Sequence, residues 1–222
     1  MSSLKPQLIL FDCDGTLVDS HGHITDVMQR TFEESALPAP TASAVRDVIG
    51  LSLHEAVLRL LPQGEDEQRQ MIIAGYRQRY GAAPDTSPLY AGVRETLETL
   101  RQNGYWLGIV TGKSHRGLMH TLDQHDLHAT FHVWRTADAC PSKPHPAMVL
   151  ECMQEMGVEA AQTSVVGDSC FDIEMAAASG VQALGVSFGV GTPESLQQAG
   201  ASDVVHSFAD LLVHFPPLQG EA

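Results

Sequence analysis

A short apolar run near the N-terminus leads directly into two acidic residues. The run is Leu8-Ile9-Leu10-Phe11, and Asp12-Cys13-Asp14-Gly15-Thr16 follows it. Four consecutive apolar residues indicate a strand that is buried on both faces, as in a parallel sheet covered by helices. In such sheets ligands bind beyond the carboxyl ends of the strands, and residues two apart in an extended segment point the same way. Asp12 and Asp14 are therefore predicted to face one site, where Gly15 lets the chain turn away.

The charge balance limits the partners of the chain. Its 222 residues include 13 Lys and Arg against 27 Asp and Glu, a formal net charge of -14. Such a surface disfavours nucleic acid and anionic membranes as partners. An anionic substrate would therefore have to be attracted locally, by a divalent cation, a lysine or helix N-termini.

Two further features concern the location of the protein. Residues 1–7 are short and polar, unlike a signal peptide, and no apolar run reaches the ~18 residues that a membrane helix needs. The four cysteines contain no C-x-x-C pair, so we expect free thiols. These cysteines are Cys13, Cys140, Cys152 and Cys170. The expectation is a cytoplasmic protein that is a monomer or a weak homodimer.

Residues 17–87 are predicted to form a small all-helical cap inserted after the first strand. Apolar residues recur there at helical spacing, and β-branched runs are scarce. The expected helices span residues 18–34, 41–48, 52–61 and 65–80. Residues 81–88 are rich in Pro, Gly and small side chains, which is typical of a linker.

From Tyr90 onward, strand and helix patterns alternate. Strands are expected at 105–110, 131–134, 163–166, 182–186 and 203–205, and helices at 92–103, from 114, and at 144–156, 171–179, 193–199 and 208–213. Repeated βα units predict an α/β fold, a Rossmann-like parallel sheet with helices on both faces. This catalytic core would comprise residues 1–16 and 88–222.

Polar residues follow four predicted strands, where a sheet buried on both faces would favour apolar ones. They are Asp12 and Asp14, Thr111 and Gly112, Lys143, and Asp168 with Asp172. The spacing of Asp168 and Asp172 would place both carboxylates on one face of the first turn of a helix. Converging carboxylates repel one another unless a cation lies among them. Carboxylate oxygens without a convincing His or Cys ligand set favour Mg2+.

These segments resemble the four motifs of the haloacid dehalogenase (HAD) superfamily of hydrolases. The resembling segments are Asp12-Cys13-Asp14-Gly15-Thr16, Val110-Thr111-Gly112, Lys143-Pro144-His145-Pro146 and Val166-Gly167-Asp168-Ser169-Cys170-Phe171-Asp172. Their order and spacing fit, and the helical insertion is similar to the type-one cap of that superfamily. The resemblance covers essentially the whole chain, and it implies a phosphatase.

The resemblance also implies the chemical roles of the acidic residues. Asp12 would attack phosphorus to form an aspartyl-phosphate, and Asp14 would act as general acid and then as general base. Mg2+ would be held by the Asp12 carboxylate, the Asp14 backbone carbonyl and Asp168. Asp172 would support this metal site or bind Lys143.

Other residues would bind the substrate. By the same resemblance, Thr111 and the Gly112 amide would hold phosphate oxygens, and Lys143 would stabilise the charge on the transferring group. The cap would close over the site and select the substrate. Arg46 and the turn at residues 50–53 are the candidates for this contact.

The opening residues 12–20, with Ile24 after them, most resemble the phosphoglycolate phosphatase branch. The expected partner is therefore a small phosphorylated metabolite, with 2-phosphoglycolate as the best candidate. The alternatives are a pyrophosphatase, a sugar-phosphate phosphatase and a β-phosphoglucomutase-like enzyme, although that mutase branch carries a histidine where this chain has Ile24. A non-catalytic phosphate-binding protein is the alternative of a different class.

One motif points to a different enzyme class. Residues 185–189 match the G-x-S-x-G nucleophile elbow of serine esterases, which requires a helix immediately after Ser187. In this chain Thr192 and Pro193 are predicted to begin the next helix, as an N-cap and a first-turn proline. The sequence therefore disfavours an esterase.

Overall fold

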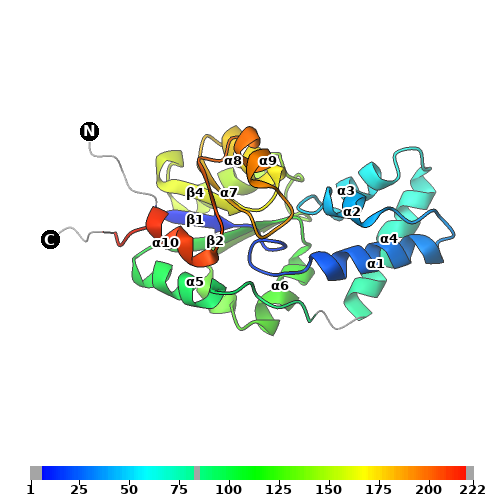
Figure 1. Cartoon of the computed structure of the whole chain (residues 1–222), viewed down its shortest axis with the longest axis horizontal. Helices are drawn as coiled ribbons and strands as arrows, with labels where there is room; N and C mark the ends of the chain where they lie inside the picture. The colour runs from blue at the N-terminus through cyan, green and yellow to red at the C-terminus, as the bar shows by residue number, and fades with distance from the viewer. Residues whose placement is uncertain (1–6, 83–85, 219–222) are drawn as a thin grey trace.

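The computed structural model describes residues 7–82 and 86–218, and a parallel sheet lies at its centre. Within those residues the sheet has six strands in the order β3-β2-β1-β4-β5-β6 (Figure 1). The strands are β1 (Leu8–Phe11), β2 (Trp106–Thr111), β3 (Val133–Thr136), β4 (Thr163–Gly167), β5 (Gln182–Val186) and β6 (Asp203–Val205). Every neighbouring pair is parallel. The predicted α/β fold class is confirmed.

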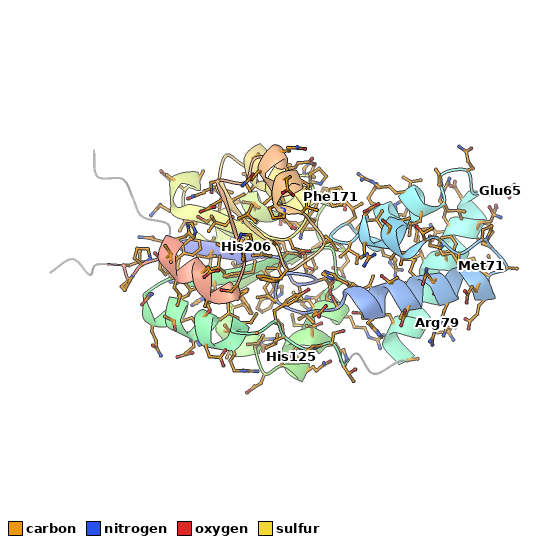
Figure 2. All side chains as sticks on the ribbon, in the orientation of Figure 1. Glu65, Met71, Arg79, His125, Phe171 and His206 are labelled. Carbon is orange, nitrogen blue, oxygen red and sulfur yellow. The ribbon has the colours of Figure 1, made fainter. Side chains whose placement is uncertain are left out.

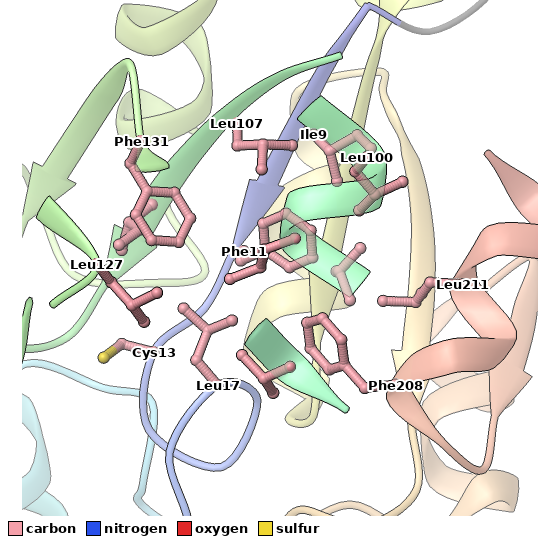
Figure 3. Close-up of a cluster of buried hydrophobic side chains, with 14 of the residues drawn as sticks. Ile9, Phe11, Cys13, Leu17, Leu100, Leu107, Leu127, Phe131, Phe208 and Leu211 are labelled. Carbon is pink, nitrogen blue, oxygen red and sulfur yellow. The ribbon is translucent and has the colours of Figure 1, made fainter. Parts of the chain in front are cut away.

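Successive residues of β1 point into two separate apolar layers. Ile9 and Phe11 belong to one cluster, shown in Figure 3, and Leu8 and Leu10 belong to the other. The first layer is covered by α5 (Val93–Gln102), α6 (His115–Gln124) and α10 (Leu211–His214), and the second by α7 (Ala147–Met156), α8 (Cys170–Ala178) and α9 (Pro193–Ala199). β1 is thus buried on both faces, as its apolar run predicts.

Four helices, which we call the cap helices, lie on one side of the sheet. They are α1 (His21–Glu34), α2 (Ala42–Arg46), α3 (Leu53–Leu60) and α4 (Asp66–Ala82). They pack around an apolar cluster of their own, which includes Met28, Phe32, Val57, Ile72 and Ile73. In Figure 1 they lie on the side of the sheet to which the chain passes from β1 into α1. The division at residues 16/17 and 87/88 stays a prediction.

Two backbone connections join the sheet to the cap helices, and they are paired with each other. The Asp19 N–H donates to the Pro88 carbonyl at 2.9 Å, and the Tyr90 N–H donates to the Leu17 carbonyl at 3.0 Å. Val18 and Leu89 form an antiparallel bridge between them. We call these paired segments the hinge seam. The middle of the predicted linker, residues 83–85, lies outside the described residues.

Some boundaries differ from the prediction. α1 begins at His21 rather than residue 18, because residues 17–19 use their backbone groups in the hinge seam. α7 begins at Ala147 rather than residue 144, because the His145 N–H donates to the Ser142 carbonyl in a turn. β3 lies two residues later than expected. Among the described residues, the structure contains no helix with the length and apolar character needed to cross a bilayer.

Candidate active site

Lys143 is buried between two carboxylates at the carboxyl ends of the strands. Its Nζ lies 2.6 Å from Asp12 Oδ1 and 2.6 Å from Asp172 Oδ1, and its side chain has no exposed surface. Asp172 is fixed at the start of α8, where the Ser169 N–H and hydroxyl donate to its Oδ2 at 3.1 and 2.7 Å. This pairing is a capping box, so the local helix signal also positions the carboxylate.

Asp168 is held by donors from two other loops. The Thr16 hydroxyl donates to Oδ1 at 2.8 Å, and the Val190 N–H donates to Oδ2 at 2.9 Å. A Cβ atom on Gly189 would lie 2.2 Å from the Asp168 Cβ, so the loop after β5 can approach only because residue 189 is glycine. This support was not recognised in the sequence, although the glycines at 189 and 191 were its signal.

The three buried carboxylates form a group that fits a metal ion. Asp12, Asp168 and Asp172 each offer an oxygen, and these oxygens lie within 4.8 Å of one another. Asp12 Oδ2 is buried and accepts no hydrogen bond from any residue that the structure describes. A buried acceptor without a donor is costly unless another positive group meets it. The all-oxygen donor set suits a hard divalent cation.

Each charge in this group alters the pKa of its neighbours. Burial raises the pKa of the Asp12 carboxyl well above its ordinary value, and the neighbouring Asp172 and Asp168 add to this effect, whereas Lys143 opposes it. Burial alone would lower the pKa of Lys143, but Asp12 and Asp172 outweigh it and raise that pKa. The lysine is therefore held as an ammonium, and further positive charge would favour an ionised Asp12.

Asp14 faces a second lysine, which sequence reasoning missed. Asp14 Oδ1 accepts from the Ser20 hydroxyl at 2.5 Å and lies 2.8 Å from Lys113 Nζ. Lys113 Nζ also donates to the Tyr80 hydroxyl of α4 at 3.1 Å. The signal in the sequence that Lys113 lies at the site is its position directly after Thr111 and Gly112. Lys113 thus links the second acid of the opening motif to the cap helices.

The turn before α3 lies directly on the end of β2. A Cβ atom at Gly112 would be 2.3 Å from the Leu51 carbonyl oxygen, so a side chain at residue 112 would collide with the backbone of this turn. The Ser52 N–H donates to the Ser142 hydroxyl at 2.9 Å. Phe171, labelled in Figure 2, packs against the small apolar cluster that includes Leu51. Residues 50–53 therefore reach the core beside the site, and their contact with a substrate stays a prediction.

A cavity of about 380 Å³ lies between the sheet and the cap helices. Asp12, Asp14, Thr111 and Gly112 line it, together with residues from α1 to α4. Arg46, the second candidate for contact with the substrate, lies outside this lining. It is the exposed last residue of α2. Val45 of the same helix lines the cavity instead, and the contact of Arg46 with the substrate stays a prediction.

The nucleophile-elbow reading finds no support in the local structure. Ser187 follows β5, but α9 begins only at Pro193, with Thr192 as its N-cap. The helix start predicted from Thr192 and Pro193 is confirmed.

All four cysteines are free, as expected.

A comparison with known families gives a match over most of the chain. The family model described as haloacid dehalogenase-like hydrolase matches residues 9–186. The protein named probable phosphatase IndB of Dickeya dadantii is 32% identical over 216 residues, which cover 94% of this chain and 93% of that protein. A protein named phosphoglycolate phosphatase of Pseudomonas putida is 32% identical over 214 residues, covering 93% of this chain and 79% of that protein.

Solved structures show the same arrangement of sheet and cap helices. A predicted phosphoglycolate phosphatase of Haemophilus somnus superposes with a TM-score of 0.84 at 28% identity, covering 94% of this chain and 97% of that chain. A haloacid dehalogenase-like family hydrolase of Streptococcus pneumoniae superposes with a TM-score of 0.84 at 26% identity, covering 97% and 100%. The likeness therefore extends over both the sheet and the cap helices.

Proposed function

The chain belongs to the haloacid dehalogenase-like hydrolase family, and from this membership and the geometry of the site we propose that it is a Mg2+-dependent phosphatase acting on a phosphomonoester. The observation that carries the proposal is the meeting of Asp12, Lys143, Asp168 and Asp172 from three separate segments beside one cavity. A buried carboxylate oxygen without a hydrogen bond, such as Asp12 Oδ2, is rare in folded proteins, and a bound cation would account for it.

Asp12 is the proposed nucleophile. Its carboxylate would attack phosphorus and form an aspartyl-phosphate while the substrate oxygen leaves. Asp14 lines the same cavity and would give its proton to that oxygen. It would then take a proton from a water that attacks the aspartyl-phosphate, which releases inorganic phosphate and restores the Asp12 carboxylate. Lys113 and Ser20 hold the Asp14 side chain in place for both steps. Mg2+, when bound by Asp12, the Asp14 carbonyl and Asp168 with Asp172 nearby, would neutralise charge between the carboxylate and the phosphate.

The phosphate would be held from the other side by groups at the end of β2. The Thr111 hydroxyl and the Gly112 N–H are the proposed donors to its oxygens. Lys143 would balance the charge on the transferring group, because its ammonium already lies against Asp12. Each of these groups would act in a site from which the cap excludes water.

The names of the relatives make 2-phosphoglycolate the reference substrate for this chain. Pyrophosphate and sugar phosphates are the alternatives that a substrate screen would separate from it. A mutase is disfavoured, because Ile24, at the position where the mutase branch carries a histidine, lines the cavity with an apolar side chain. The proposed location in the cytoplasm and the proposed monomer or weak homodimer stay predictions.

Removal of the metal is expected to abolish phosphatase activity. With p-nitrophenyl phosphate and excess Mg2+, we expect steady release of nitrophenol, and with EDTA a fall to the rate without enzyme. The physical reason is that Asp12 is surrounded by two further carboxylates and cannot approach a dianionic phosphate without added positive charge. The measurement is the absorbance of nitrophenolate in the two buffers.

A matched assay with p-nitrophenyl acetate is the control. It is expected to show no enzymatic rate in either buffer, because the site contains no serine nucleophile elbow. Ester hydrolysis that ignores EDTA would favour an esterase. Binding of phosphate without turnover of any phosphomonoester would favour the non-catalytic alternative.

A further inference from the structure

The cavity beside Asp12 continues from the phosphate-binding groups into the cap helices, and its wall there is mainly apolar. The apolar side chains from this side are Ile24, Met28, Val45, Val48, Ile49, Leu53, Ala56 and Tyr76. The volume of about 380 Å³ lies in the range of pockets that hold drug-sized ligands, roughly 300–1,000 Å³. A phosphate with a two-carbon acid would leave much of this apolar wall against water.

The positive charges around the cavity do not suit a small carboxylate deep inside it. Lys113 is buried but already contacts Asp14 and Tyr80. Arg77 and Arg116 line the cavity, but both residues are exposed and therefore lie toward its mouth. Placing the carboxylate of glycolate beside Asp14 would bring two negative groups together around one ammonium.

We propose that this cavity selects phosphomonoesters whose alcohol is apolar and of the size of an aromatic ring, in preference to 2-phosphoglycolate. This inference rests on the proposed phosphatase function and concerns its leaving-group site. The phosphate lies at Asp12 and Gly112, and the apolar body of the alcohol contacts the side chains of α1 to α4. Each apolar group removed from water there contributes to binding in the transition state, so the selectivity is in kcat/KM.

Three substrates test this preference under the same conditions. They are 2-phosphoglycolate, ethyl phosphate and 3-phenylpropyl phosphate, and the last two are esters of primary alcohols with similar leaving groups. We expect kcat/KM for 3-phenylpropyl phosphate to exceed the other two values by ~10-fold or more, since one buried methylene alone is worth ~10-fold or more in a well-fitted pocket. Release of inorganic phosphate is measured in each case.

A pair of variants on one helix links the preference to the cavity. Leu53→Asn places an amide on the apolar wall, and we expect the ratio of kcat/KM for 3-phenylpropyl phosphate over ethyl phosphate to fall ~10-fold. Leu58→Asn is the control, because Leu58 is on α3 but is 38% exposed and lies outside the cavity lining. Its ratio is expected to match that of the wild type.

The outcomes separate the inference from the proposed function. Hydrolysis with 2-phosphoglycolate as the best substrate, or a ratio that Leu53→Asn and Leu58→Asn change equally, overturns the inference while the phosphatase function stands. No phosphate release from any of the three substrates or from p-nitrophenyl phosphate overturns the proposed function and the inference together.

Discussion

Replacement of Asp12 by Asn is expected to lower the rate of phosphate release by about 10^4-fold or more, because the amide cannot attack phosphorus. The substitution preserves the volume of a side chain that is 1% exposed, so little repacking is required. It also removes one negative charge from a group of three carboxylates. The measurement is the release of inorganic phosphate at saturating substrate and Mg2+.

The control for this prediction is a second Asp→Asn substitution away from the site. Asp26 is exposed on α1, and Asp26→Asn should retain the wild-type rate. Urea unfolding of Asp12→Asn should show that the variant is folded. A folded Asp12→Asn enzyme with more than about one hundredth of the wild-type rate would rule out Asp12 as the nucleophile.

Replacement of Lys143 by Met is expected to be the most destabilising single change in the site. It would leave Asp12 and Asp172 buried without their shared ammonium, and breaking a buried ion pair in this way costs about 3–5 kcal/mol. Phosphate release should fall on the order of 100-fold or more as well. The free energy of unfolding is measured with urea in EDTA, so that no metal compensates the carboxylates.

A double variant distinguishes charge from packing. In the double variant Lys143→Met/Asp172→Asn, one of the two carboxylates left without the ammonium is removed. This double variant should therefore be more stable than Lys143→Met alone. If the lysine merely fills space, the second substitution should lower stability further. An unfolding midpoint of Lys143→Met equal to that of the wild type would show that the buried pair contributes nothing to folding.

Local pattern was sufficient for the sheet and for the residues that end its strands. The side chains of β1 alternate between two core layers. A short apolar run followed directly by acidic residues is typical of a buried strand that ends at the edge of a parallel sheet. Asp12, Lys143, Asp168 and Asp172 were each assigned to a strand end or to the loop after it. The topology of a parallel sheet then brings such ends to one edge.

What sequence pattern missed depends on contacts between distant segments. Lys113 could be placed at a strand end, but its partners Asp14 and Tyr80 come from two other parts of the chain. Arg46 is a candidate because a segment between cap helices can reach the core, but sequence pattern does not show that its side chain lies on the exposed side of α2. The start of α1 shifted because residues 17–19 pair with residues 88–90.

The hinge seam limits how the cap helices can move relative to the sheet. The two connections are hydrogen-bonded to each other through Leu17, Asp19, Pro88 and Tyr90. The two connections are therefore not free to move independently of each other. Glu65 and Met71 lie at the far end of the cap helices (Figure 2), so a rotation about the hinge seam would move that end the most. Such a rotation would separate the turn at 50–53 from Gly112 and let product depart, while the two apolar layers of the sheet and the apolar cluster of the cap helices stay intact.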